Sequence, residues 1–166
     1  MTYRILFILS FIFSINAFGQ HEDKKEMTSF VPKSKAYDIY YPKDFSLKED
    51  EDGIVTIYDS TSKITITISA YGIGKGMNDD KLITQLNDFV KSYFKNDLKK
   101  EDWKSYKTKF DVLVESTFTV KQINWVWYGI VDKQRLVTIS INKDSNIEQE
   151  ELNLIRFMIN NLLIKD

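Results

Sequence analysis

The sequence feature that most constrains the fold is a strict alternation of apolar and polar residues over 64–70, "ITITISA". Successive side chains of a β-strand point to opposite faces, so this alternation predicts a strand with one buried and one polar face. The segments "VLVESTFTV" (112–120) and "LVTISIN" (136–142) alternate in a similar way. The segment "INWVWYGIV" (123–131) is apolar on both faces, which predicts a central strand or one covered on both sides.

Short turn sequences separate these predicted strands. The Asp-Gly pair at 52–53 is typical of a type I′ hairpin turn, in which both central residues have positive φ. The same stretch has acids near the spacing of a calcium loop, but Lys48 stands where the first ligand would be, so we favour the turn. The Lys-Gln pair at 121–122 and the stretch 132–135 are expected to close two more hairpins. Connections this short predict an antiparallel sheet.

Two segments carry apolar residues at helical spacing, 78–94 and 145–164. The second contains Ser145 and Glu148 at the spacing of a capping box. The predicted order is β-β-β-α-β-β-β-α, with 99–109 unassigned. We therefore predict an α+β fold in which an antiparallel sheet of about six strands has helices packed on it, as a two-layer or an α/β/α sandwich.

The N-terminal residues predict export. Residues 1–19 contain one cation, Arg4, followed by an apolar run and small residues, which is typical of a secretory signal peptide cleaved before Gln20. The apolar run is shorter than the ~20 residues that span a bilayer, so no transmembrane segment is expected after cleavage. We expect 20–36 to be a flexible tether and 37–166 a single α+β domain. The predicted location is the periplasm or the external medium.

Composition sets several classes of function aside. The chain has 23 Lys and Arg residues against 24 Asp and Glu residues. This near balance gives no net positive potential that would attract nucleic acid. It has no cysteine, which excludes thiol nucleophiles, disulfides and a lipoprotein anchor. The only histidine, His21, lies in the predicted tether. We expect no catalytic residue, no metal site and no cofactor, although a carboxylate pair drawn from Asp111, Glu115 and Asp38 stays open as a hydrolase hypothesis.

Two groups of residues are candidate binding sites. Trp125 and Trp127 share one face of their predicted strand and Tyr128 lies on the other; these rings could bind a small apolar or sugar ligand, or fill the core. Hydroxyl-bearing residues on several strands form a candidate partner surface, which consists of Thr65, Thr67, Thr117, Thr119, Thr138 and Ser140. Such a polar face fits a solvated or ligand-facing sheet better than one packed under a helix.

The stretch "DIYYPKDF" (38–45) opens the domain, and a three-strand meander ending in "RLVTISI" (135–141) precedes a closing amphipathic helix. This arrangement resembles the PsbP/DcrB-like group of secreted or envelope α/β/α domains over 37–164. The resemblance rests on element order and implies a binding or accessory module, with no functional residue carried over. We therefore expect a non-enzymatic binding or accessory protein with an envelope protein partner. The alternatives are a carrier of a small apolar or sugar ligand and a carboxylate-based hydrolase.

Overall fold

The computed structural model describes residues 25–166, so the predicted signal peptide, His21 and the start of the predicted tether lie outside the described residues. In chain order the elements of this part are β1 (Met27–Phe30), β2 (Tyr37–Pro42), β3 (Ser46–Glu49), β4 (Val55–Asp59), β5 (Ile64–Gly72), α1 (Asp79–Phe94), a 3₁₀ turn (Lys100–Asp102), β6 (Trp103–Ser105), β7 (Val112–Val120), β8 (Ile123–Asp132), β9 (Arg135–Lys143), α2 (Gln149–Asn160) and β10 (Leu163–Ile164). Neither helix has the length and apolar character needed to cross a membrane within these residues.

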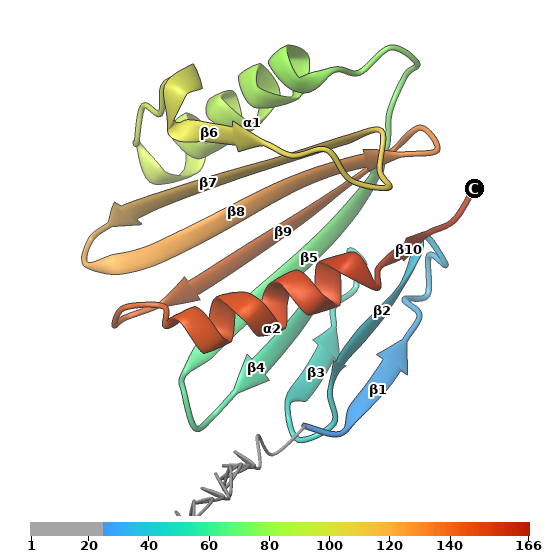
Figure 1. Ribbon diagram of the computed structural model, residues 1–166, viewed down its shortest axis with the longest axis vertical. Coiled ribbons are helices and arrows are strands. Elements are labelled where there is room, and N and C mark those ends of the chain that lie inside the picture. The colour runs from blue at the N-terminus through green and yellow to red at the C-terminus, as the bar shows by residue number, and fades with distance from the viewer. Residues whose placement is uncertain (1–24) are drawn as a thin grey trace, which may run out of the picture.

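The larger of two sheets is antiparallel and has the order β3-β4-β5-β9-β8-β7-β6 (Figure 1). The alternation over 64–70 forms most of β5, with the isoleucines buried and the threonines between them half-buried, as predicted. The sheet has seven strands rather than the six predicted, because β6 forms within the unassigned stretch 99–109.

Tight hairpins connect the middle strands. The β7–β8 turn places Lys121 and Gln122 at φ values of 49° and 66°, which confirms the predicted two-residue hairpin. The hairpin predicted at 52–53 also forms, but only Gly53 has positive φ, so the turn is not type I′. Instead, the Asp50 carboxylate accepts a hydrogen bond of 2.8 Å from the N–H of Ile54, and this bond stabilises the turn.

The predicted first strand divides into β2 and β3, which belong to different sheets. The chain turns after Pro42, where the N–H of Phe45 donates to the Pro42 carbonyl at 3.0 Å. β2 joins a three-stranded sheet between β1 and β10. β1 lies within the segment predicted to be a flexible tether, and its pairing with β2 from Met27 to Phe30 corrects that prediction for these residues.

The predicted second helix is shorter than the periodic segment. α2 begins at Gln149, and the Glu151 carboxylate accepts from the N–H of Glu148 at 2.8 Å, so the predicted capping pair of Ser145 and Glu148 is wrong. The helix ends before Leu163, because the last apolar residues pair with β2 as β10. Over only two residues, the apolar pattern of a helix cannot be distinguished from that of a short buried strand.

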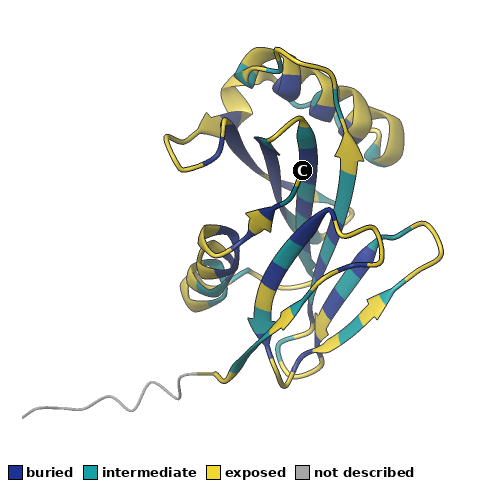
Figure 2. Cartoon of the chain, turned by 90° about the vertical axis from the view of Figure 1, so that its right-hand side faces the viewer, coloured by how far each residue is buried: buried dark blue, intermediate teal, exposed yellow. Residues whose placement is uncertain are grey.

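The helices pack on opposite faces of the larger sheet, which makes an α/β/α arrangement (Figure 1). Ile155, Met158 and Ile159 of α2 belong to one core with the buried rows of β4, β5 and β9 and with the inner side of β2. Leu82 and Leu86 of α1 belong to a second core, formed with β7 and β8. Both helices turn their buried sides toward the sheet (Figure 2). β8 is buried on both sides, in agreement with its two-sided apolar sequence.

Candidate binding surface

The strand register divides the six candidate hydroxyl residues between the two faces of the sheet. Residues opposite each other on neighbouring strands share a face. Thr67 pairs with Ser140, and Ser140 pairs with Trp127, so these residues lie on the α1 face. Thr65 and Thr138 share that face by the alternation of their strands.

Thr117 and Thr119 lie on the other face. Thr117 pairs with Val126, which belongs to the core under α2, and Thr119 pairs with Asn124 two residues away. The predicted single hydroxyl surface is therefore corrected to four residues on the α1 face and two on the α2 face. The reason is that β7 turns its apolar side toward α1, whereas β5 and β9 turn theirs toward α2.

Much of the α1 face has no helix over it among the described residues. α1 packs on β7 and β8, and among the described residues of β9 only Leu136 belongs to the core beneath it. Beyond β8 the sheet presents a surface that we call the open face, which consists of Thr56, Tyr58, Thr65, Thr67, Ser69, Tyr71, Thr138, Ser140 and Asn142. The two tyrosines are exposed and the other seven residues are half-buried.

The open face is uncharged, although 28% of the residues of the chain are charged. Its nine residues are Thr, Ser, Asn and Tyr. On the neighbouring edge strand, Lys48 pairs with Thr56 and so shares this face at its rim. The surface therefore offers many hydrogen-bonding groups and no ionic group at its centre.

An aromatic flank of α1 stands beside the open face. On one side of α1, Asn87 accepts a 2.7 Å hydrogen bond from the indole N–H of Trp103 on β6, so this side faces the β6 edge of the sheet. Phe89 and Tyr93 lie on the other side of the helix, with ring centroids 4.3 Å apart. Tyr93 is 70% exposed and Phe89 is 40% exposed, so much of both rings faces solvent.

Trp125 and Trp127 fill the space under the end of α1. The Trp127 ring centroid lies 5.2 Å from that of Phe89 and 5.8 Å from that of Phe94, and its side chain is 5% exposed. Trp125 is half-buried, with its ring 4.7 Å from Phe94. Both indole N–H groups are buried, and neither has a hydrogen-bond partner within residues 25–166. These contacts make the two residues part of the second core, and a ligand role for them stays a prediction.

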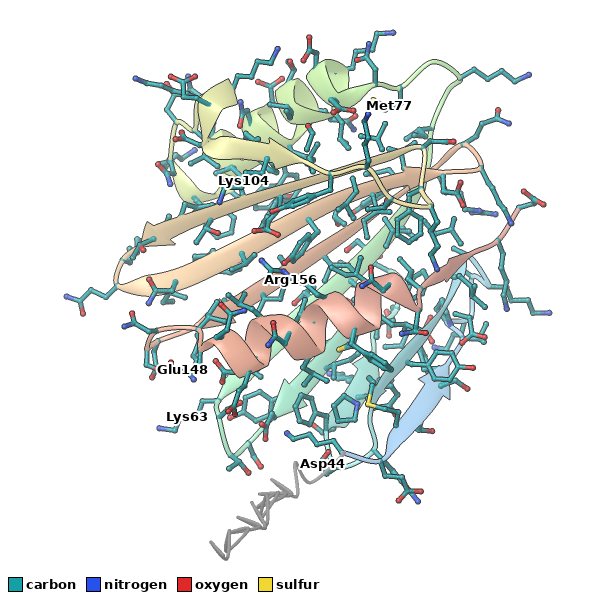
Figure 3. The ribbon with its side chains drawn as sticks, in the orientation of Figure 1. Asp44, Lys63, Met77, Lys104, Glu148 and Arg156 are labelled. Carbon is teal, nitrogen blue, oxygen red and sulfur yellow. The ribbon has the colours of Figure 1, made fainter. Side chains whose placement is uncertain are left out.

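Tyr128 lies on the α2 face, apart from the two tryptophans. It pairs with Glu115, a carboxylate that is only 7% exposed. Burial raises the pKa of Tyr128, and the nearby Glu115 carboxylate raises it further. Arg156 of α2 supplies the counter-charge, with its Nη2 4.0 Å from Glu115 Oε2 (Figure 3). This cluster joins α2 to the sheet.

The three carboxylates of the hydrolase hypothesis lie in different surroundings. The ion-pair partner of Glu115 within the described residues is Arg156. Asp111 is exposed just before β7. Burial raises the pKa of Asp132, and the negative charge of Asp111 raises it further. Asp38 belongs to β2 of the smaller sheet and pairs with Leu163. These positions do not bring any two of the three acids together as the carboxylate pair that a hydrolase would need.

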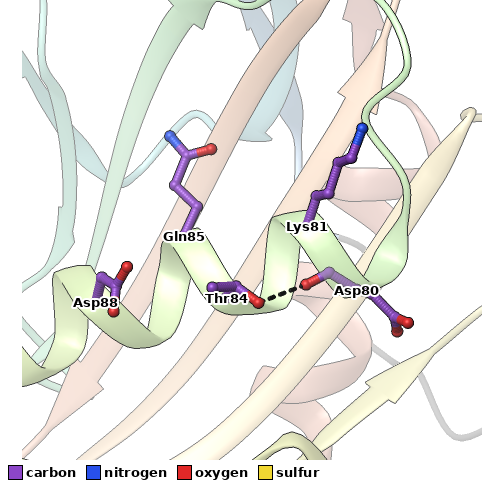
Figure 4. Close-up of a pocket in the computed structure, with 5 residues that line it drawn as sticks. All are labelled: Asp80, Lys81, Thr84, Gln85 and Asp88. Carbon is purple, nitrogen blue, oxygen red and sulfur yellow. Dashed lines mark hydrogen bonds between the residues drawn. The ribbon is translucent and has the colours of Figure 1, made fainter.

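A shallow depression on α1 is lined by Asp80, Lys81, Thr84, Gln85 and Asp88 (Figure 4). The Thr84 hydroxyl donates to the Asp80 carbonyl at 2.8 Å, and the Asp80 carboxylate lies 2.7 Å from Lys100 Nζ. Thr84 and Asp80 therefore have local structural partners. The depression is part of the solvated side of the helix.

The fold is similar to that of PsbP. The solution structure of cyanobacterial PsbP (CyanoP) from Synechocystis sp. PCC 6803 superposes with a TM-score of 0.63 at 8% identity, over 85% of this chain and 94% of that one. A crystal structure from Bacteroides thetaiotaomicron VPI-5482 gives a TM-score of 0.60 at 14% identity, over 83% of this chain. This chain spans about half of that second protein, 48% of its length. The likeness at these identities concerns the fold.

Sequence comparison adds no relative to these structures. The chain matches no protein-family profile and no curated protein. The predicted resemblance to PsbP-like domains is thus confirmed by the fold alone.

Sequence reasoning missed five members of the open face, and the signal for them was present. Thr56, Tyr58, Ser69, Tyr71 and Asn142 all continue the alternation of strands that were predicted correctly. The aromatic flank of α1 was missed for another reason. Phe89 and Tyr93 occur in the apolar stripe of the helix, and the sequence does not show that the stripe is wider than the part of the sheet it covers.

Proposed function

We propose that this protein is a non-enzymatic binding or accessory protein that works through the open face. The observation that supports the proposal is that α1 does not cover the uncharged side chains of β4, β5 and β9. These side chains lie beside the aromatic flank of α1. A polar sheet face in contact with solvent needs no functional explanation, but one bordered by exposed aromatic rings has the mixture of groups found at binding sites. The PsbP-like fold agrees with an accessory role.

A capture experiment with matched variants tests this proposal. The full chain is immobilised and exposed to envelope extract of the source cell, and both retained protein and retained carbohydrate are measured. Thr67→Arg places a long cation at the centre of the open face, and Thr117→Arg places the same side chain on the opposite face. We expect Thr67→Arg to abolish retention and Thr117→Arg to preserve it. Equal retention by the two variants, or no retention by the natural protein, would overturn the proposal.

We also propose that the protein is exported after cleavage between residues 19 and 20, and that its partner is a component of the envelope. The support is the charge, apolar run and small residues of 1–19. The intact mass of the protein recovered from cell fractions tests export. We expect an envelope or medium species that begins at Gln20, whereas a cytoplasmic protein that retains residues 1–19 contradicts it.

A further inference from the structure

We propose that the open face binds a neutral polysaccharide chain, which lies along β5 between Tyr58 and Tyr71. This inference rests on the proposed function, because it names the chemistry of the partner at the same surface. It follows from three properties of the open face, which are its charge, its size and the position of its aromatic rings.

The charge of the open face matches an uncharged ligand that carries many hydroxyl groups. Thr65, Thr67 and Ser69 follow one another along β5, and Thr138 and Ser140 lie beside them on β9. Hydroxyl groups both donate and accept, so such rows can exchange hydrogen bonds with sugar hydroxyls in either direction. Ser and Thr are under-represented among the residues that dominate protein–protein binding energy. An anionic chain would find no cation at the centre of this surface.

The size of the open face favours a chain over a folded protein. From Thr65 to Tyr71 the strand extends about 20 Å, and the three strands β4, β5 and β9 span about 10 Å across. A strip this narrow suits an extended chain better than a globular partner, whose stable interfaces bury about 800 Å² of accessible surface on each side. A polysaccharide chain needs only a strip of this shape, several sugar units long.

Exposed tyrosine rings mark the two ends of this strip. Tyr58 pairs with Thr65 at one end, and Tyr71 lies on the same side of β5 at the other end. Aromatic rings offer flat, electron-rich faces, against which the C–H faces of sugar rings can stack. The rows of hydroxyl groups can therefore orient a bound sugar chain, and the two tyrosine rings can stack against its sugar units.

Titration of the full-chain protein with saccharides, followed by NMR of the backbone amides, tests this inference. The probes are linear neutral hexasaccharides of glucose, mannose and xylose, the neutral polysaccharide fraction of the source envelope, and an acidic hexagalacturonate. We expect saturable shifts of amides in β4, β5 and β9 with at least one neutral probe. Absence of such shifts with every neutral probe, or equal binding of the acidic probe, overturns the inference.

Conservative variants separate hydroxyl recognition from simple contact. Thr67→Val keeps the shape of the side chain and its preference for strands but removes the hydroxyl, so we expect saccharide binding to weaken about tenfold. Thr117→Val is the matched control on the other face and should bind normally. Tyr71→Leu should lose the stacking contribution, and Tyr71→Phe should retain it. Undiminished binding by Thr67→Val would contradict the proposed recognition.

Failure of this inference is distinguishable from failure of the proposed function. If no neutral saccharide binds but an envelope protein is captured by the natural protein and lost with Thr67→Arg, the open face is a protein-binding surface and the saccharide inference is wrong. If neither saccharide nor envelope protein depends on the open face, both proposals are overturned.

Discussion

Gly129 sets how closely α1 approaches the sheet. A Cβ atom at this position would lie 2.6 Å from Leu86 Cδ1 and 3.1 Å from Leu82 Cδ2, both on α1. The two nearest of these contacts are with the helix, so the absence of a side chain at 129 lets α1 pack closely against β8. The residue therefore serves the core beside the open face.

Gly129→Ala is expected to lower the free energy of unfolding by about 1–3 kcal/mol, because the leucine side chains must move to admit the methyl group. Urea unfolding measures the loss. Gly74→Ala is the control, since a Cβ at Gly74 would meet no atom within 4 Å. An equal effect of the two substitutions would show that the contact with Leu86 does not limit the packing.

The hairpin between β7 and β8 uses residues poorly suited to its turn. Lys121 and Gln122 both have positive φ, a region that favours glycine and asparagine. Replacing the pair by Asn-Gly should raise the free energy of unfolding by about 1 kcal/mol, because these residues adopt a type I′ turn with less strain. Thermal or urea unfolding checks the gain. Lys99→Gly, at a φ of −100°, should bring no such gain.

Besides its apolar side chains, α2 contacts the sheet through an ion pair with a buried carboxylate. Removing the Arg156 side chain, as in Arg156→Met, leaves Glu115 without its cation and should cost about 1–3 kcal/mol of stability. Lys91→Met breaks an exposed ion pair with Asp97 and should cost less than about 1 kcal/mol. Denaturant unfolding compares the two. If adding Glu115→Leu to Arg156→Met fails to recover stability, the unpaired charge is not the cause of the loss.

At the level of elements, sequence alternation predicted the long strands and missed the short ones. β5, β7, β8 and β9 each have nine or ten residues, enough to show a period. β1, β6 and β10 have two to four residues and depend on pairing with a neighbour. The candidate surface was predicted in part because strand periodicity gives two faces but does not say which faces of different strands coincide. Here the buried sides of β5 and β7 point in opposite directions.

At the level of the whole molecule, the N-terminal segment contacts the domain through the pairing of β1 with β2 and also through the charge of Lys25. Lys25 Nζ lies 3.8 Å from Asp59 and 4.4 Å from the centre of the Phe45 ring. Burial alone would raise the pKa of Asp59, but hydrogen bonds from Thr61 and Ser62, together with Lys25, hold that pKa below its usual value. The ionised carboxylate is therefore favoured in the folded state.

Because the pKa of Asp59 is lower in the folded state than in the unfolded state, its stabilising contribution is present above about pH 4 and is lost as the pH falls through the folded-state pKa. Asp59→Asn should therefore reduce stability at neutral pH and show a smaller further loss on acidification. Unfolding free energies measured from pH 7 to pH 3 check this. Parallel pH profiles for the natural protein and the variant would contradict the assignment. Asp88→Asn is a useful control, since that carboxylate is exposed on α1, away from Lys25.

β2 receives one neighbour from each end of the described chain, β1 on one side and β10 on the other. These two neighbours are far apart in the sequence, so this small sheet forms only when both of them have reached β2. Helix α2 likewise shares its core with strands far from it in the sequence, such as β2 and β4. Contacts between segments so distant in sequence are slow to form, so the small sheet and the α2 side of the core should be completed late in folding.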